Sequence, residues 1–543
     1  MEILVRVQHP ACAVRGDQRR RHSAMRRDLA ADVVIRRPRG LNDDVAVGAS
    51  RVEDDGVDEM PRKITDELRL PQPCVHARGL PWIEQATTPI SHRDTVPLAA
   101  VPRYARAMTQ FSPLAEHLSR MIQIPTVADR DDATFEAFVA LIEDLYPNVH
   151  AALERERITD RGLLFRWRGA RDKDPLVLMA HYDVVPADSS EWGEDPFSGR
   201  IENGVVHGRG ALDDKGPLLV ILEAVESLLT DGFSPARDVY LSFGGNEESF
   251  GAGAAAIVET LRSRSIRPWL VLDEGGAVVD SPLPYTAGSA AMIGTGEKGQ
   301  VTLKLTATSE PGHASAPRGI SAIDRLARAT ARLTPATFRP RTPEAIVRML
   351  HALADRATGP ARIVYRLLSH SRFLAGRLFA ALGGEPAALV RTTIAATLQT
   401  GGSAPNVLPA SASVTFNLRI IPGESVDSVT RRVRRRIGDS RIAVSSLEGA
   451  DPTPLSPVDA PQFELIAEAV GSAYPDAVPT PYLMMQASDA RYFHAISDHV
   501  YRFAPLTMTS EQRASIHGIG EHVSIDSLER GRAFHAALIR SLT

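Results

Sequence analysis

Hydrophobic and polar positions alternate along most of this chain in two ways, which indicate two kinds of domain. In the first kind, apolar residues recur at helical spacing in stretches such as 132–145 and fill short strands such as 175–181. Strands that alternate with amphipathic helices are typical of a doubly wound α/β sheet. We therefore expect an α/β main domain with a mixed sheet in residues 108–295, completed by residues 425–543.

The second pattern begins near residue 296. Residues 299–309 alternate strictly between apolar and polar side chains, as a half-exposed antiparallel strand does. A helix and two more alternating strands follow, so we expect residues 296–424 to form a smaller α+β domain inserted into the first. Between its strands lies a helical, arginine-rich stretch, 340–390, whose charges are more typical of a solvated face than of a substrate site. The helix after residue 424 is expected to lead back to the main domain.

Residues 1–107 follow neither pattern and mix arginines, acidic clusters and prolines. They are either a disordered regulatory tail or a segment outside the translated protein, with translation starting at Met108, where a clean amphipathic helix opens. A transit peptide fits less well, because acidic residues are plentiful. The first residues lack the apolar core of a secretory signal, and no apolar run reaches the roughly 18 residues of a membrane span. We expect a cytoplasmic protein without a membrane partner.

Composition narrows the chemistry. The chain is 43% hydrophobic and 24% charged, with a formal net charge of -4. It therefore lacks the excess of positive charge that is typical of nucleic-acid-binding proteins. Its two cysteines, Cys12 and Cys74, both lie in the irregular first part. A disulfide framework, a thiolate-rich metal site and a cysteine nucleophile are therefore excluded from the body of the protein. A metal site there would consist of histidine and carboxylate ligands.

Acidic and histidine residues gather where the predicted strands of the main domain end. His181 and Asp183 follow an apolar strand two positions apart, so their side chains point the same way. The other candidates are Asp213, Asp214, Glu247, Glu248, Asp273, Glu274 and His517. Such loops can converge at one edge of a doubly wound sheet, where so many carboxylates repel unless cations neutralise them. Two divalent ions with a bridging carboxylate would do so, and a remaining glutamate could act as general base.

Each of these features alone has a simpler interpretation. A histidine and an aspartate at one strand end are usually a surface pair, and a double glutamate is usually a solvated loop. The glycine-rich turn 208–216 could cradle a phosphate, but it lacks the spacing of a P-loop and its final Ser or Thr. The joint occurrence of five such elements in one alternating pattern favours the metal site.

Longer stretches make a family resemblance plain. They are LMAHYDVVP, WGEDPFSGRIENGVVHGRGALDDKG, FGGNEESFGAGA, VLDEGG, GTGEKGQ, EPGHASAP, GGSAPNVLPASASVTFNLRIIPG and IHGIGEHVS. With these motifs in order over roughly 110–543, the chain resembles the M20 family of dizinc metallopeptidases. The similarity is to the branch that holds carboxypeptidase S and the N-acyl-amino-acid hydrolases. The resemblance implies that the inserted domain is a ferredoxin-like lid or dimerisation domain, with a homodimer as one possible assembly.

The resemblance also implies a ligand set. His181 and Asp273 would hold one zinc ion, Glu248 and His517 the other, and Asp213 would bridge the two, with Co²⁺ or Mn²⁺ as possible substitutes. Two further carboxylates have roles without binding metal: Asp183 would orient His181, and Glu247 would be the general base. A cis peptide bond is expected between Asp213 and Asp214.

Residues of the inserted domain are implied in substrate binding. His313 would stabilise the oxyanion of the tetrahedral intermediate, and in dimeric relatives this histidine reaches the partner's site. Asn406 and Arg419 would bind substrate, with Arg419 as a clamp for a free carboxylate. The simpler alternatives are a loop-capping role for His313 and a structural ion pair for Arg419. Asp489 and Arg491 resemble a substrate-side loop, although the residues before them, 486–488, depart from the family pattern.

The implied reaction is hydrolysis of an amide bond next to a free carboxylate, in a small peptide or an N-acyl amino acid. Two alternatives remain at this point. One is a deacetylase or desuccinylase acting on an amino-acid intermediate, and the other is a non-catalytic, metal-stabilised binding module. The presence of every expected ligand argues against the binding module.

Overall fold

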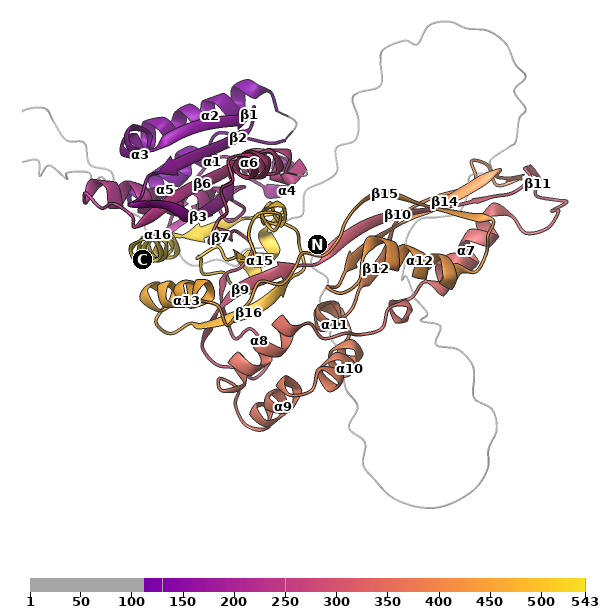
Figure 1. Ribbon diagram of the computed structural model, residues 1–543. Coiled ribbons are helices and arrows are strands. Elements are labelled where there is room, and N and C mark those ends of the chain that lie inside the picture. The colour runs from indigo at the N-terminus through magenta and orange to yellow at the C-terminus, as the bar shows by residue number, and fades with distance from the viewer. Residues whose placement is uncertain (1–111, 129, 250, 543) are drawn as a thin grey trace, which may run out of the picture. The chain divides into compact units, whose positions relative to one another are not determined.

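The computed structural model describes residues 112–542 except 129 and 250 (Figure 1). The two interpretations of residues 1–107, and both cysteines, therefore lie outside the described residues. Within the described part, every helix is too short or too polar to cross a bilayer.

A large mixed sheet forms the centre of the main domain. Its strands run in the order β1-β2-β6-β3-β7-β17-β9-β16, and β8 pairs with β9 beside this path. Strands β6, β3, β7 and β17 are mutually parallel, whereas β2 and β9 run antiparallel to their neighbours β6 and β17. The strands are β1 (Glu154–Thr159), β2 (Gly162–Trp167), β3 (Arg171–His181), β6 (Arg237–Gly244), β7 (Leu270–Asp273), β8 (Val278–Asp280), β9 (Ser289–Glu297), β16 (Val478–Met484) and β17 (Val500–Arg502).

Helices cover both faces of this sheet because successive residues of its strands point to opposite sides. In β3, Leu176 and Leu178 belong to one hydrophobic core, and Val177 and Met179 belong to another. The expected doubly wound α/β arrangement is therefore confirmed. On the first face lie α1 (Pro113–Ile122), α2 (Asp132–Leu145), α3 (Pro147–Ala152), α5 (Lys215–Thr230), α13 (Pro461–Ala473) and α16 (Ile525–Arg540); on the second lie α6 (Ala252–Ser263) and α14 (Ala490–Phe493).

The inserted domain has a four-stranded antiparallel sheet of its own. Its sheet order is β12-β14-β10-β15, and its elements follow the chain order β-α-β-β-α-β, the ferredoxin-like arrangement that was expected (Figure 1). Helices α7 and α12 share a core with the sheet. The elements are β10 (Gly299–Thr308), α7 (Ala322–Arg332), β12 (Thr393–Thr400), β14 (Ser411–Ile420), α12 (Val426–Ile437) and β15 (Ile442–Ala450).

The expected end of this domain at residue 424 is wrong. Helix α12 does not lead back to the main domain, because Val429 and Val433 pack into the core of the inserted sheet. Strand β15 then pairs with β10 as the edge strand, from Ile442 to Ala450. The inserted domain therefore extends to about residue 450. The edge strand escaped the sequence prediction because most of its residues are exposed and give no apolar alternation.

Four helices fill the arginine-rich stretch 340–390, as the sequence predicted. They do not add to the core of the inserted sheet. Instead, Ile346 and Leu350 share a core with Leu483 of β16 and Ala290 of β9, at the edge of the large sheet. The helices are α8 (Glu344–Ala354), α9 (Pro360–Ser369), α10 (Arg372–Leu382) and α11 (Gly384–Val390).

The remaining elements are short. Strands β18, β5 and β4 form a three-stranded sheet, and β11 pairs with β13 in a two-stranded one. Their bounds are β4 (Ile201–Glu202), β5 (Val205–His207), β11 (Gly312–His313), β13 (Val407–Leu408) and β18 (His522–Ser524). Short helices occur at α4 (Ser189–Trp192), η1 (Glu247–Ser249), η2 (Pro335–Thr337) and α15 (Ser510–Ser515).

The buried imidazole of His535 in α16 is expected to make the folded protein less stable at low pH. Neither ring nitrogen has a hydrogen-bond partner among the described residues, and burial lowers the pKa of His535 to about 3. Below an ordinary pKa of about 6.5, the unfolded chain binds a proton that the folded imidazole does not, so the residue destabilises the fold increasingly as pH falls. The variant His535→Leu should therefore gain stability over wild type at pH 5.5, by about 1.4 kcal/mol from this effect.

Thermal unfolding at several pH values would measure this gain. At pH 8 the imidazole is neutral in both states, so the same comparison isolates the packing effect of the new side chain. A difference in melting temperature that stays constant from pH 8 to pH 5.5 would contradict the assignment.

Candidate active site

The carboxyl ends of three parallel strands place most of the candidate side chains at one edge of the large sheet. His181 is the last residue of β3, Glu247 and Glu248 follow β6, and Glu274 follows β7. This edge is where ligands bind in open α/β sheets. Two segments from elsewhere add to it: the turn before α5 contributes Asp213, and the loop before β18 contributes His517.

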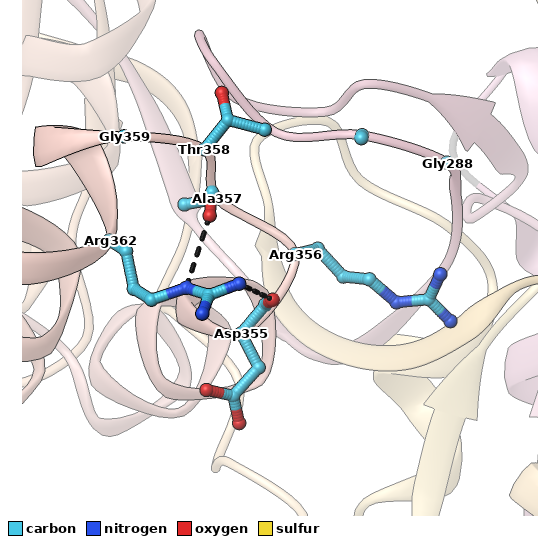
Figure 2. A pocket seen from close by; sticks show the side chains of 8 residues that line it. Gly288, Asp355, Arg356, Ala357, Thr358, Gly359 and Arg362 are labelled. Carbon is cyan, nitrogen blue, oxygen red and sulfur yellow. Dashed lines mark hydrogen bonds between the residues drawn. The ribbon is translucent and has the colours of Figure 1, made fainter.

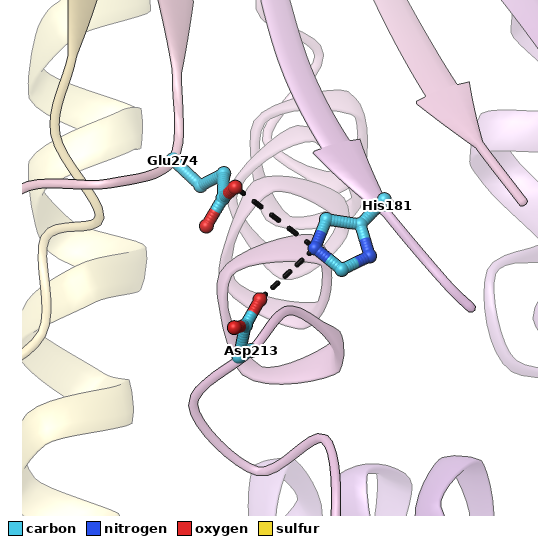
Figure 3. Close-up of side chains that lie close together, drawn as sticks. All are labelled: His181, Asp213 and Glu274. Atoms are coloured by element: carbon cyan, nitrogen blue, oxygen red, sulfur yellow. Dashed lines mark hydrogen bonds and ion pairs between the residues drawn. The ribbon is translucent and has the colours of Figure 1, made fainter. Parts of the chain in front are cut away.

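Three side chains form the first group of potential metal ligands (Figure 3). The Nε2 atom of His181 lies 3.0 Å from Oδ1 of Asp213 and 4.0 Å from Oε1 of Glu274. The histidine is 2% exposed, so its ring position is set by packing and hydrogen bonds.

A second group shares Asp213 with the first. Nε2 of His517 lies 3.1 Å from Oδ2 of Asp213 and 3.0 Å from Oε1 of Glu248. Asp213 thus turns one carboxylate oxygen toward each histidine, which is the geometry of a residue placed between two cations. His517 adopts a left-handed backbone conformation, with φ +59°, to present its ring from the loop.

The electrostatics of the cluster fit the binding of cations. Burial raises the pKa of Glu274 well above its ordinary value, and the nearby charges of Asp213 and Asp214 raise it further. Burial also raises the pKa of Glu247, with Asp489 and Asp213 as further causes. So many partly buried carboxylates are unfavourable without compensating positive charge. Imidazole nitrogen and carboxylate oxygen are the donors that zinc and similar divalent ions accept, so these residues fit a two-metal centre.

One expected ligand is not in the cluster. Asp273 is the last residue of β7, and its Oδ2 accepts a hydrogen bond from the backbone N–H of Ala490 at 2.8 Å. The next residue, Glu274, is the one that faces His181. The group of potential ligands around His181 thus contains Glu274 and not Asp273. Neighbouring residues at a strand end point in different directions, and the sequence alone does not reveal which of the two acidic side chains points inward.

Asp183 connects two parts of the site. Its carboxylate oxygens accept hydrogen bonds from the backbone N–H groups of Glu247 and Glu248, both at 3.1 Å. Its Oδ1 also lies 3.4 Å from Nδ1 of His181, and its carbonyl oxygen lies 3.0 Å from the same nitrogen. Asp183 therefore fixes the orientation of the His181 ring and holds the backbone of both glutamates.

The peptide bond between Asp213 and Asp214 is cis, as the sequence predicted. The two side chains serve different purposes. Asp213 faces the histidines, whereas Oδ2 of the fully buried Asp214 accepts a hydrogen bond from the backbone N–H of His181 at 2.9 Å. Asp214 thereby ties the glycine-rich turn to the end of β3.

Glu521 is a positioning residue that the sequence analysis did not single out. Its buried carboxylate accepts hydrogen bonds from the backbone N–H groups of Gly210, Leu212 and Asp213, at 2.7–3.1 Å. The guanidinium of Arg209 donates to it as well, at 2.7 Å. One side chain near the C-terminal end thus holds the turn that presents Asp213. Its place in the motif IHGIGEHVS was the only available signal.

The loop with Asp489 and Arg491 is held by a buried ion pair. Oε1 of Glu297 lies 2.7 Å from Nη2 of Arg502 and accepts a hydrogen bond from the Ser488 hydroxyl at 2.8 Å. Burial, with the nearby charge of Asp273, raises the pKa of Asp489 to about 7. Asp489 also lies so close to Gly251 that a Cβ atom there would meet its Oδ1 at 1.8 Å.

The implied substrate-binding residues lie in the inserted domain, outside the metal-ligand groups of the described residues. His313 is exposed in β11, which pairs with β13, and the carbonyl of Asn406 accepts from the N–H of Ala314 at 3.0 Å. His313 and Asn406 are therefore neighbours. Arg419 lies on β14 opposite Gln300 of β10. Their roles in substrate binding stay predictions.

Known proteins resemble this chain in sequence and in fold. The family model described as peptidase family M20/M25/M40 matches residues 177–541. A probable carboxypeptidase S-like 2 from Dictyostelium discoideum is 32% identical, over 79% of this chain and 85% of that protein. The human N-fatty-acyl-amino acid synthase/hydrolase PM20D1 is 33% identical, over 81% of this chain and 90% of that protein.

Solved structures support the same fold. The M20 family metallo-carboxypeptidase Sso-CP2 from Sulfolobus solfataricus superposes with a TM-score of 0.57 at 18% identity, over 79% of this chain and 99% of that chain. Human carnosine dipeptidase 1 gives a TM-score of 0.54 at 16% identity, over 79% and 96% of the two chains. The sequence match, the fold and the clustered ligands agree, and this chain therefore belongs to peptidase family M20/M25/M40 and is an enzyme with peptidase or amidohydrolase activity.

Proposed function

We propose that this enzyme hydrolyses an amide bond next to a free carboxylate, in a small peptide or an N-acyl amino acid, with a metal-dependent mechanism. The observation that carries the proposal is the position of Asp213 between two histidines, with Glu247 beside the pair. The substrate class follows the names of the relatives, which are a carboxypeptidase S-like protein and an N-fatty-acyl-amino acid synthase/hydrolase.

Two divalent cations, which we propose to be zinc, would occupy the site. His181 and Glu274 would hold one, Glu248 and His517 the other, and Asp213 would contact both. Bound there, the ions would polarise the scissile carbonyl and lower the pKa of water. Co²⁺ or Mn²⁺ would suit the same nitrogen and oxygen donors.

Glu247 is the residue that moves the proton. Its carboxylate belongs to the group with His181 and Glu248 but is not needed by either pair of ligands. Its raised pKa suits a base that accepts a proton from the attacking water and then donates it to the leaving amine. The hydrogen bond from its N–H to Asp183 holds the start of η1 in place during both transfers.

The inserted domain would complete the substrate site. We propose that His313 stabilises the oxyanion and that Asn406 and Arg419 bind the substrate, with Arg419 contacting its carboxylate. A homodimer through the inserted domain would deliver these groups from one protomer to its partner. The exposure of His313 is compatible with such a contact. The cytoplasmic location stays a prediction.

The variant Glu247→Gln tests the proton-transfer role. The glutamine side chain has nearly the same size, and the backbone N–H can still donate to Asp183. The amide cannot accept the proton from water, so kcat should fall about 10²–10⁴-fold. Metal content, measured by elemental analysis, should stay at the wild-type level. A purified variant with near wild-type kcat would show that another group is the base.

The neighbouring pair Asp273 and Glu274 offers a matched test of the ligand assignment. Glu274→Gln should lower the amount of bound metal, because it weakens a ligand that faces His181. Asp273→Asn should retain both ions, since an amide oxygen still accepts the hydrogen bond from Ala490. Metal titration with a competing chelator would measure both variants. The reverse pattern would restore Asp273 as the ligand.

A further inference from the structure

Helices α9 and α10 present apolar side chains to solvent. On α9 these are Ile363, Val364 and Leu367, of which Ile363 is 65% exposed. On α10 they are Phe373, Leu374, Leu378 and Leu382, of which Phe373 is 68% exposed. Together they are half of the large hydrophobic side chains that are exposed in the described residues, gathered within 20 positions. We call them the α9–α10 surface.

The outward face of these helices is a second apolar face. Their inner face is already buried, because Tyr365 and Leu368 of α9, and Ala375 and Phe379 of α10, belong to the core shared with β16. A surface helix of a soluble protein normally turns polar residues outward once its apolar stripe is packed. Exposed apolar side chains gathered on two neighbouring helices indicate an interaction site.

The charge around the α9–α10 surface is positive. From Arg356 to Gly384 the sequence contains five arginines and no acidic residue, although the whole chain has a net charge of -4. Arg366 forms a salt bridge with Asp355, which directly precedes this segment, and Arg372 forms one with Glu344 at the start of α8.

Three of the five arginines have no salt-bridge partner among the described residues. They are Arg356, Arg362 and Arg377. Arg362 donates to the backbone carbonyls of Ala357 and Asp355, and the guanidinium of Arg377 lies over the Phe373 ring, 5.2 Å from its centroid. Arg362 and Arg377 therefore place positive charge beside the apolar side chains of α9 and α10, and the nearby Asp355 carboxylate, which already pairs with Arg366, offsets part of it.

A pocket of about 600 Å³ opens beside the start of α9 and is lined by Arg356, Arg362 and the carboxylate of Asp355 (Figure 2). Next to it lies Tyr285, which is 75% exposed and whose carbonyl accepts a hydrogen bond from the Thr358 N–H. Tyrosine at the border between apolar and charged groups is typical of the interfacial region of a bilayer.

We propose that the α9–α10 surface docks on a bilayer that contains anionic phospholipids. The apolar side chains enter the boundary between head groups and acyl chains, and Arg356, Arg362 and Arg377 lie at the level of the phosphates. A basic amphipathic element of this composition binds in the plane of the membrane, so no spanning helix is required. The expectation of no membrane partner, made from the lack of an apolar span, does not cover this mode of binding.

A second copy of the chain fits the surface less well. In a two-fold dimer the same patch faces itself, so the three arginines without a salt bridge in each protomer would approach those of its partner. Like charges across an interface are unfavourable, whereas phosphate groups complement them. Charge complementarity therefore favours lipid over self-association.

Vesicle co-sedimentation of the full chain tests the proposal independently of catalysis. Binding should be stronger to vesicles that contain about 30 mol% phosphatidylglycerol than to vesicles of pure phosphatidylcholine. It should weaken when the salt concentration is raised to about 0.5 M, because salt screens the attraction between arginine and phosphate. The double variant Leu367→Ser/Phe373→Ser should weaken partitioning about tenfold or more. The variant Arg362→Gln/Arg377→Gln should weaken binding to the anionic vesicles alone.

A matched control comes from the inserted domain. Leu398 and Leu447 are 67% and 60% exposed outside the α9–α10 surface, so Leu398→Ser/Leu447→Ser should leave vesicle binding unchanged. Circular dichroism melting of each variant checks that the fold is retained. The proposal would be overturned if wild-type protein did not co-sediment with the anionic vesicles. A dimer that Leu367→Ser/Phe373→Ser converts to monomer in sedimentation velocity would overturn it too, and would assign the surface to a second copy.

Discussion

Repulsion among partly buried carboxylates is the constraint on which the site depends. Asp213, Glu247, Glu248 and Glu274 lie around two histidines, and burial raises the pKa of Glu247 and Glu274 well above the ordinary value. Among the described residues, these four carboxylates form no salt bridge with arginine or lysine, and backbone hydrogen bonds hold the segments that carry three of them. Asp183 and Glu521 use their own carboxylates for this purpose, each accepting from several N–H groups. The positive charge that such a site needs is left to bound cations.

The arrangement of the sheet makes this gathering possible. Parallel strands β6, β3 and β7 end at the same edge, so His181, Glu248 and Glu274 meet there although they come from separate segments. His517 and Glu521 come from the far end of the chain, about 300 residues after the turn that holds Asp213. Folding of the C-terminal part is therefore a condition for assembling the metal-ligand groups.

The inserted domain and the 340–390 helices show how one chain carries separate tasks. The inserted domain bears His313, Asn406 and Arg419, which the proposed function uses for substrate: Arg419 lies in the ferredoxin-like sheet, and His313 and Asn406 lie at the two-stranded sheet of β11 and β13. The helices α8–α11 pack instead against the edge of the large sheet, and the outer face of α9 and α10 is apolar and basic. A bilayer contact there would attach the main domain itself, leaving the inserted domain free to contact substrate.

Sequence alone determined the features that repeat locally or stand in long motifs. The helices and strands of the main domain, the ferredoxin-like insertion, the cis bond at Asp213 and most metal-ligand candidates followed from periodicity and family resemblance. Tertiary structure decided the features that depend on the direction of a side chain or on a pairing partner far away in the sequence. It turned Glu274, and not Asp273, toward His181, because side-chain direction at a strand end is set by packing. It assigned β15 to the inserted sheet and revealed Glu521 as the support of the turn, because neither a pairing partner nor a hydrogen-bond acceptor 300 residues away leaves a local pattern.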